Sequence, residues 1–240
     1  MTAAAFIKKL ETFRSAIELK KYHRFFDFDE KNPGKGDAFI GVRMGHVFNL
    51  AKEFLDMPPA EIEKLLESNI HEVRAGGCSV MGKQCDHKNT TDARRKELYD
   101  LYLRRHDRIN DWDLVDLASY KVVGRYLFDS GKPRTILYKL AGSRNRWERR
   151  TAIVSTAYFI RKGEVEDAFS IGEILINDKE DTVNKATGWM LRYAGDKDRP
   201  RLLDFLNKYG ATMSRILLRN AIEKLDRKQR DYFLNLKRSE

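Results

Sequence analysis

Five short segments of the sequence share a position that carries a charged side chain and is followed within two residues by an alanine. These charged residues lie 42, 34, 35 and 34 residues apart and are Arg74, Asp116, Arg150, Lys185 and Arg219. A repeat of this length is typical of stacked helical hairpins, in which equivalent positions form a row on one surface. Four cations in such a row favour a polyanion as ligand, and the single carboxylate, Asp116, is the odd chemical group among them.

An aromatic ring accompanies the carboxylate. Trp112 lies four residues before Asp116, so the two side chains share one face of a helix that Asn110 or Asp111 would cap. Trp189 follows Lys185 by four residues in another repeat. A helical tryptophan is by default a core residue, and Trp147, just before Arg150, is expected to wedge between repeats in that way.

Helical periodicity of apolar residues runs through almost the whole chain, with glycines and prolines at the expected helix ends, and no segment is typical of a strand. The pattern predicts an all-α helical-repeat solenoid, formed as a single domain over residues 1–240 from about five antiparallel hairpins, with the row of cations along a groove for a polyanion. The predicted helices are 2–20, 43–55, 59–69, 71–82, 91–106, 111–128, 133–141, 146–162, 165–176, 181–194, 199–209, 213–224 and 227–237.

One segment interrupts this pattern. Residues 22–42 begin with aromatic side chains and continue through Asn-Pro-Gly-Lys-Gly-Asp, a composition that cannot continue a helix. The glycine part is expected to connect the first helix to the repeats.

The composition indicates which partners the protein could bind and which compartment it would occupy. Lys plus Arg is 46 against 36 for Asp plus Glu, a net charge of +10 that favours nucleic acid or an acidic membrane surface. No run is long and apolar enough to span a membrane, and the N-terminus lacks the pattern of a secretory signal. Two cysteines without an export signal are expected to be reduced thiols, which predicts a cytoplasmic protein.

The sequence predicts neither a metal ion nor a cofactor. The candidate metal ligands His71, Cys78, Cys85 and His87 fit no paired zinc spacing, and the two cysteines, seven residues apart on one amphipathic helix, are expected in the core.

Several segments together resemble the AlkD-like DNA alkylation repair proteins. Residues 110–116 (NDWDLVD), 147–153 (WERRTAI) and 186–192 (ATGWMLR) look like three successive signatures of that family. Residues 39–43 (FIGVR) are similar to the segment that enters its first full repeat. The matches occur in order, at compatible spacing, and span residues 22–221.

The resemblance implies an all-α solenoid of HEAT-like repeats whose basic concave face holds duplex DNA, and an enzyme that removes bases bearing a cationic alkyl group. When bound to DNA, the protein would associate with the nucleoid. Asp116 would be the catalytic carboxylate, Trp112 and Trp189 the aromatic walls beside the lesion, and Arg150 a contact to the DNA backbone. An aromatic residue from the first hairpin would also lie near the lesion. Phe25 is the best match for it, and Tyr22 and Phe26 are the alternatives.

Elementary chemistry agrees with these roles. An N3- or N7-alkylated purine is already a cationic leaving group, so its departure needs stabilisation of the sugar cation and a positioned water, which one carboxylate can supply. Electron-rich indole faces attract a cationic base by about 0.5–2 kcal/mol each. No lysine is marked as a Schiff-base nucleophile, which predicts a monofunctional glycosylase without strand cleavage. The protein is expected to act as a monomer with no obligate protein partner.

Alternatives exist for each residue and for the whole chain. Asp116 could instead pair with an arginine of the next repeat, Arg74 and Arg219 could be solvated or inter-repeat charges, and Lys185 could be a DNA contact or a surface charge. The chain could also be a non-catalytic relative that binds unusual DNA structures, or an adaptor whose groove holds an acidic peptide.

Overall fold

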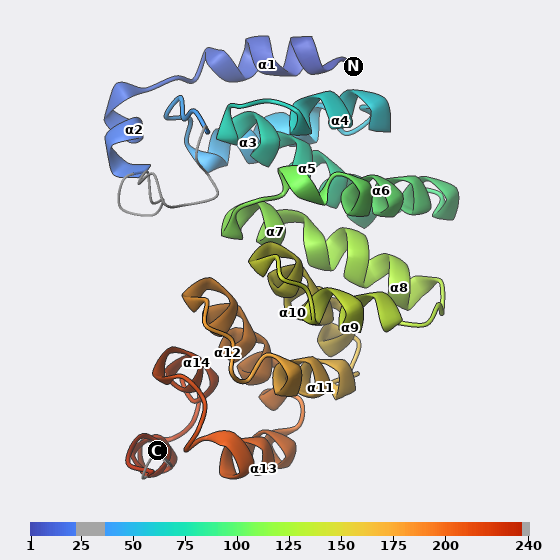
Figure 1. The fold of residues 1–240 in the computed structure, drawn as a ribbon. Coiled ribbons are helices and arrows are strands. Elements are labelled where there is room, and N and C mark those ends of the chain that lie inside the picture. Colours follow the sequence, from blue (N-terminus) through green and yellow to red (C-terminus); the bar gives the residue numbers. More distant parts are fainter. Residues whose placement is uncertain (23–36, 237–240) are drawn as a thin grey trace. The chain divides into compact units, whose positions relative to one another are not determined.

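The structure is a computed structural model, and it describes residues 1–22 and 37–236. The chain divides into two compact units, residues 1–126 and 127–240. Within the described residues every named element is a helix, and β-type pairing is confined to an isolated bridge between Ala38 and Ile70 (Figure 1). The predicted all-α helical repeat is confirmed.

In the first unit, α3, α5 and α7 pack in one row, while α4 and α6 pack against α5 as a second row. Helix α1 covers α3 and α4. The helices are α1 (Ala3–Glu11), α2 (Ala16–Tyr22), α3 (Met44–Glu53), α4 (Pro59–Leu66), α5 (His71–Asp86), α6 (Asp92–Arg104) and α7 (Trp112–Ser119), with a 3-10 turn at His106–Arg108. A π-helical turn, Tyr120–Gly124, and α8 (Arg125–Asp129) follow α7.

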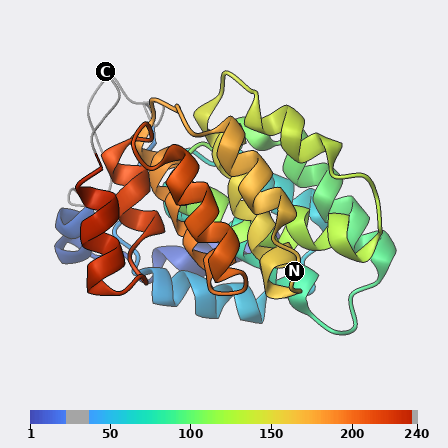
Figure 2. The same cartoon turned by 90° about the horizontal axis from the view of Figure 1, so that it is seen from below.

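The second unit repeats this plan. Helices α10, α12 and α14 form one row, and α9, α11 and α13 pack against it. Figure 2 shows the helices of this unit packed side by side. They are α9 (Thr135–Ala141), α10 (Arg146–Arg161), α11 (Glu166–Ile174), α12 (Asp181–Gly195), α13 (Arg199–Tyr209), α14 (Arg215–Ala221) and α15 (Arg227–Leu234).

A glycine allows close contact between α12 and α14 in the second unit. A Cβ atom at Gly188 of α12 would lie 2.5 Å from the carbonyl oxygen of Leu217 and 2.6 Å from Cβ of Asn220, both on α14. Any larger residue would have to push the two backbones apart, so Gly188 sets the spacing between α12 and α14.

The prediction of one helix over 2–20 is wrong. The chain turns between α1 and α2, where the Ser15 hydroxyl accepts from the Glu18 amide at 3.3 Å and the Ser15 amide donates to the Ile40 carbonyl at 3.4 Å. Gly41 approaches this turn with φ +73°, and a Cβ there would lie 2.1 Å from the Ser15 carbonyl oxygen. Pairing with a distant loop, which helical periodicity does not report, therefore breaks the helix.

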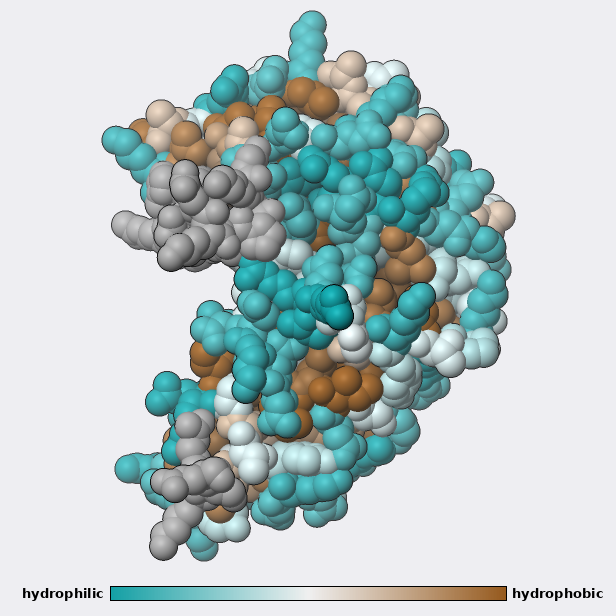
Figure 3. Space-filling model, in the orientation of Figure 1, coloured by the Kyte–Doolittle hydropathy of each residue, from teal (hydrophilic) through white to brown (hydrophobic). Residues whose placement is uncertain are grey.

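Two further expectations concern burial and membranes. Both cysteines are buried in α5, as predicted. Among the described residues, none of the helices combines the length and the apolar character that crossing a membrane requires. The surface in Figure 3 is mostly hydrophilic, with apolar side chains in scattered areas.

Candidate functional site

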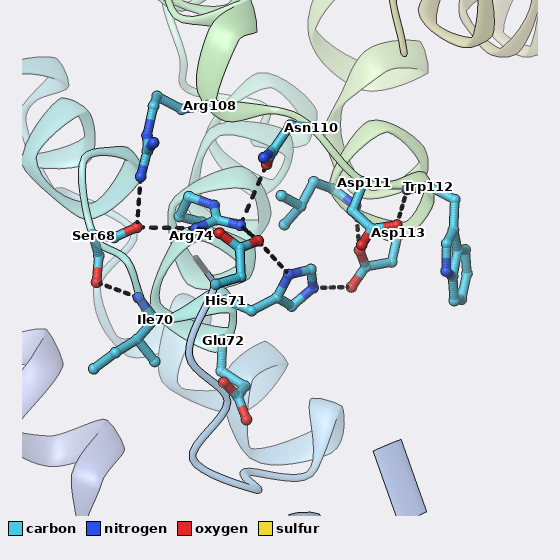
Figure 4. Close-up of polar contacts among 12 residues, drawn as sticks. Ser68, Ile70, His71, Glu72, Arg74, Arg108, Asn110, Asp111, Trp112 and Asp113 are labelled. Atoms are coloured by element: carbon cyan, nitrogen blue, oxygen red, sulfur yellow. Dashed lines mark hydrogen bonds and ion pairs between the residues drawn. The ribbon is translucent and has the colours of Figure 1, made fainter. Parts of the chain in front are cut away.

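The first turn of α7 holds the predicted aromatic and acidic residues. Asp111 caps this helix, and its side chain accepts from the Trp112 amide at 2.6 Å. The apolar face of α7 packs into the core, whereas Trp112 and Asp116 are half-buried. The indole of Trp112 points away from His71 and Arg74 (Figure 4). One helix therefore presents both predicted side chains at the border between core and surface.

The helix that carries Asp116 changes character just after it. The predicted helix 111–128 is helical throughout, but residues Tyr120–Gly124 form a π turn between α7 and α8. A π turn is rare and is frequent at functional sites, because it realigns the side chains on either side of it.

His71, the first residue of α5, links three segments of the first unit. Its Nε2 lies 2.8 Å from Oδ2 of Asp113 on α7, and its Nδ1 lies 3.8 Å from Oδ2 of Asp37. The Phe39 ring stacks on the imidazole, with centroids 4.7 Å apart and planes 22° apart. Figure 4 shows the contact between His71 and Asp113, both of which are buried. The first turn of α7 is thus tied to α5 through buried polar atoms.

Arg74, one turn later on α5, is completely buried. Its guanidinium forms a two-pronged ion pair with Asp37 and donates to the Ser68 carbonyl at 3.0 Å and to Oδ1 of Asn110 at 3.3 Å. The expectation of a surface row of cations is wrong for this position, and the inter-repeat alternative is confirmed. An arginine here satisfies several acceptors at once because its donors lie in a planar fork.

Glu72 holds the segment that enters α3. It is buried, and its carboxylate accepts from the amides of Ile40, Gly41 and Val42 at 2.8–3.2 Å. The Tyr22 hydroxyl donates to the Val42 carbonyl. Consecutive residues at the start of α5 therefore anchor different neighbouring segments.

His71, Arg74, Asp37, Asp111 and Asp113 form a cluster of charged groups, in which the pKa values of His71, Asp111 and Asp37 are shifted. Burial alone would lower the pKa of His71, but the carboxylates of Asp113, Asp37 and Asp111 outweigh burial and raise this pKa to about 9. Burial, followed by the negative charge of Asp113, raises the pKa of Asp111 to about 6. Burial acts to raise the pKa of Asp37 too, but His71 and Arg74 outweigh it and lower this pKa. At neutral pH two cations therefore face two carboxylates, with Asp111 near its own pKa.

Among the described residues, one group of side chains could together supply ligands to a metal ion, and it belongs to this cluster. Ligand atoms of His71, Asp111 and Asp113 lie within 4.8 Å of one another. A metal ion would have to displace a proton that His71 holds to about pH 9 and break the imidazole's 2.8 Å contact with Asp113. His71 and Asp113 are therefore already engaged with each other in an ion pair. Neither cysteine belongs to this group, and burial raises the pKa of the Cys78 thiol.

The second unit carries the remaining predicted residues that the structure describes. Arg150 on α10 is buried and donates to the carbonyl of Thr182 at the start of α12. Lys185 and Trp189 lie one turn apart on α12, and both are exposed, Trp189 by 37%. Trp147 is buried, as expected of a wedge between helices.

The predicted residues thus fall into two groups. Asp116 and Trp112 come together on α7 of the first unit, and Lys185 and Trp189 come together on α12 of the second, in which Arg150 contacts the start of α12. Their meeting around one substrate stays a prediction. Phe25 and Phe26 lie outside the described residues, whereas Tyr22 does not.

The sequence pattern does not predict the buried contacts at the start of α5. It offers His71 only as a candidate metal ligand and does not single out Asp37 or Glu72. A usable signal was the run of polar residues at the start of α5, where His71, Glu72 and Arg74 interrupt an otherwise apolar and small-residue helix. Buried polar groups require partners, so such a run predicts contacts to other segments.

Comparison with known proteins identifies the family. The model of the DNA alkylation repair enzyme family matches residues 6–225. The chain belongs to this family. A solved structure described as a predicted DNA alkylation repair enzyme from Enterococcus faecalis is similar in fold, with a TM-score of 0.65 and 16% identity. The alignment covers 90% of this chain and 98% of that one. A search of curated proteins found no match. Membership supports a role in DNA repair, with DNA as the partner.

Proposed function

We propose that this DNA alkylation repair family member is an AlkD-like, monofunctional DNA glycosylase. It would act on duplex DNA and excise purines that carry a cationic N3- or N7-alkyl group. The observation that carries the proposal is the pairing of Trp112 and Asp116 on α7, both half-buried, at the helix whose first turn is anchored in the core.

The reaction breaks the N-glycosidic bond and leaves the bonding electrons with the base. An N3- or N7-alkylated purine thereby loses its positive charge and leaves as a neutral molecule, so no acid has to protonate it. The positive charge moves to the sugar, where the Asp116 carboxylate stabilises it. Water then adds to C1′ and gives up a proton, which the same carboxylate can accept. The products are the free base and an abasic site.

The aromatic residues would recognise the charge of the damaged base. The indole faces of Trp112 and Trp189 attract a cation more strongly than a neutral base, by about 0.5–2 kcal/mol per ring. Trp189 has the exposure that such a contact needs, and Lys185 one turn away could bind the neighbouring phosphate.

Arg150 would contribute differently from Lys185. Because its guanidinium already donates to the Thr182 carbonyl and is buried, it supports the start of α12, the helix of Lys185 and Trp189. A phosphate contact would have to use other donors of the same planar group, which offers five N–H bonds.

Release of base from duplex DNA with a single 7-methylguanine tests the proposal. The wild type should release 7-methylguanine faster than the spontaneous rate, and Asp116→Asn should release it only at that rate. Asp116→Asn should still bind the duplex, because the substitution removes a negative charge and keeps the shape of the side chain.

Three outcomes would contradict the proposal or the role of Asp116 in it. Background release by a wild type that binds DNA would indicate a non-catalytic DNA-binding protein. A covalent adduct with DNA trapped by borohydride would indicate an amine nucleophile and thus a bifunctional enzyme. Loss of the fold in Asp116→Asn, seen by circular dichroism, would indicate that the carboxylate is structural.

A further inference from the structure

We infer that His71 is a positioning residue for the excision site, because it fixes the first turn of α7 and with it the places of Trp112 and Asp116. This inference rests on the proposed function of those two side chains. His71 itself is buried in the first unit, where it contacts other side chains of the protein.

The imidazole has one short polar contact, one longer ion-pair contact and one stacked ring. Its Nε2 contacts Asp113 at 2.8 Å, its Nδ1 lies 3.8 Å from Asp37, and Phe39 stacks on the ring. Asp37 in turn forms an ion pair with Arg74, which lies on the same helix, α5, as His71. The orientation of His71 is therefore set by residues outside α7, so it can act as a fixed point for that helix.

Asp113 connects this fixed point to α7. It is the second residue of the helix, with Trp112 immediately before it and Asp116 three residues, about one turn, after it. One carboxylate oxygen of Asp113 contacts His71, and the other accepts from the Leu114 amide at 2.8 Å. The same carboxylate thus binds the backbone of the first turn and the neighbouring helix, so a shift of Asp113 moves the turn that carries Trp112.

Removing the imidazole leaves a buried carboxylate without its charged partner. Asp113 is only 7% exposed, so it must then find water or another donor by moving. Helix α7 has only eight residues and ends in a π turn, which gives its first turn little rigidity of its own. A misplacement of about 1 Å at a reacting group can slow a reaction about 100-fold.

The position of His71 also predicts an effect of pH on excision. Among the residues that the structure describes, Asp37 from the segment before α3 and Asp111 and Asp113 from α7 raise the pKa of His71, and Arg74 of α5 pairs with Asp37. Tyr22 of α2 and Glu72 of α5 lie close enough to interact with each other, and Tyr22 also interacts with Asp113. Because His71 keeps its proton up to about pH 9, its ion pair with Asp113 should persist at neutral pH and weaken above about pH 9.

The test compares His71→Ala and His71→Gln with a core variant, Leu65→Ala. Leu65 is fully buried on α4 and packs near Gly77, in the middle of α5 rather than at its start. It therefore controls for a general loss of stability. Each protein is assayed for single-turnover release of 7-methylguanine at saturating enzyme, for DNA affinity and for Tm.

We expect His71→Ala to release base at least 10-fold more slowly than Leu65→Ala at a similar loss of Tm, with a Kd for DNA within about twofold of the wild type. His71→Gln, which keeps an N–H donor for Asp113, should recover part of the rate. Should His71→Ala fail to fold, His71→Gln against Leu65→Ala gives the same comparison. Equal rates in the His71 and Leu65 variants would overturn the inference.

A second measurement separates this inference from the proposed function. Amide hydrogen exchange of residues 111–119 should be faster in His71→Ala than in Leu65→Ala, whether or not the wild type releases base. An inactive wild type with this exchange difference would refute the glycosylase and keep the positioning role. Unchanged exchange in α7 would refute the positioning role, even if the wild type is active.

Discussion

At the scale of single residues, the start of α7 places two carboxylates in different electrostatic settings. Asp113 contacts the positively charged His71, whereas Asp111 caps the helix and has a pKa raised to about 6 by burial and by the charge of Asp113. The same short turn therefore contains one carboxylate stabilised by a cation and one that is costly to ionise. Both lie beside the helix face that carries Trp112.

Asp111→Asn should stabilise the protein at pH 7.5. A folded-state pKa raised from 3.8 to about 6 means that the folded protein binds this proton more tightly than the unfolded chain does. The resulting stability is complete below pH 3.8 and is lost as pH rises through about 6. Asparagine also caps helices and stays neutral, so the free energy of unfolding should rise by about 1–3 kcal/mol at pH 7.5.

Urea denaturation at pH 7.5 and pH 4.5 would measure this gain, which should be much smaller at the lower pH. Asp107→Asn is the matched control, since Asp107 is a largely exposed acid just before α7, and its substitution should change the free energy by less than about 0.5 kcal/mol. A destabilised Asp111→Asn at pH 7.5 would show that the charge of Asp111 is needed against His71.

His71 should make stability fall at alkaline pH. Its pKa is raised from 6.5 to about 9, so the contribution of its proton is complete below pH 6.5 and is lost as pH rises through about 9. Denaturation of wild type and His71→Gln between pH 6 and 10 should give curves that converge towards pH 10. Parallel curves would show that His71 is neutral in the folded protein.

At the scale of elements, each unit depends on close contact within its first row of helices. Helix α5 contacts α7 through buried charges, while α12 contacts α14 through the small residue Gly188. The buried charges fix the orientation of α5 relative to α7, because polar contacts are directional. The missing side chain at Gly188 sets the distance between α12 and α14. Trp189 follows Gly188 directly, so the helix spacing also bears on the predicted aromatic wall.

Gly188→Ala should destabilise the second unit. The added Cβ would lie 2.5–2.6 Å from Leu217 and Asn220, and the Leu217 contact is a backbone oxygen that cannot swing away. The clash should outweigh the better helix propensity of alanine and lower the free energy of unfolding by about 1–3 kcal/mol. Gly45→Ala in α3 is the control, because its Cβ meets nothing within 4 Å. A fully stable Gly188→Ala would show that α14 can move away without cost.

At the scale of the whole molecule, the excess of positive over negative charge lies mostly in one part of the chain. Residues 127–240 contain 24 Lys and Arg against 16 Asp and Glu, whereas residues 1–126 contain 22 against 20. The second unit thus carries +8 of the net charge of +10. Because phosphate contacts by lysine and arginine dominate affinity for DNA, most of the salt-dependent binding should come from this unit.

Lys185→Ala should weaken binding to duplex DNA of any sequence and reduce the slope of log K against log salt by about 1. Fluorescence anisotropy between about 50 and 200 mM salt would measure the slope. Lys139→Ala, an exposed lysine on α9 of the second row, removes the same charge and should change the slope less. Equal changes in the two variants would assign Lys185 to the general charge of the surface.

Arg150→Ala should lower both stability and DNA affinity. Its guanidinium is buried and donates to Thr182, so its loss should reduce Tm, and any phosphate contact should reduce the salt slope as well. Thermal unfolding and the salt titration together separate these effects. A lower Tm with an unchanged slope would contradict the predicted contact to the DNA backbone and leave Arg150 as a support for α12.

Local sequence determined the helices and the placing of side chains on them. Helical spacing sufficed to put Trp112 and Asp116 on one face and to identify Asp111 as one of two candidate caps, because both depend on contacts within a turn. Tertiary structure alone decided the break between α1 and α2, the burial of Arg74 and Arg150, and the contacts of His71 with Asp37 and Asp113. The paired side chains lie 32–42 residues apart in the chain, and the break between α1 and α2 is held by a loop that is distant in the sequence. Only packing removes such polar groups from water, and a buried polar group then needs a partner.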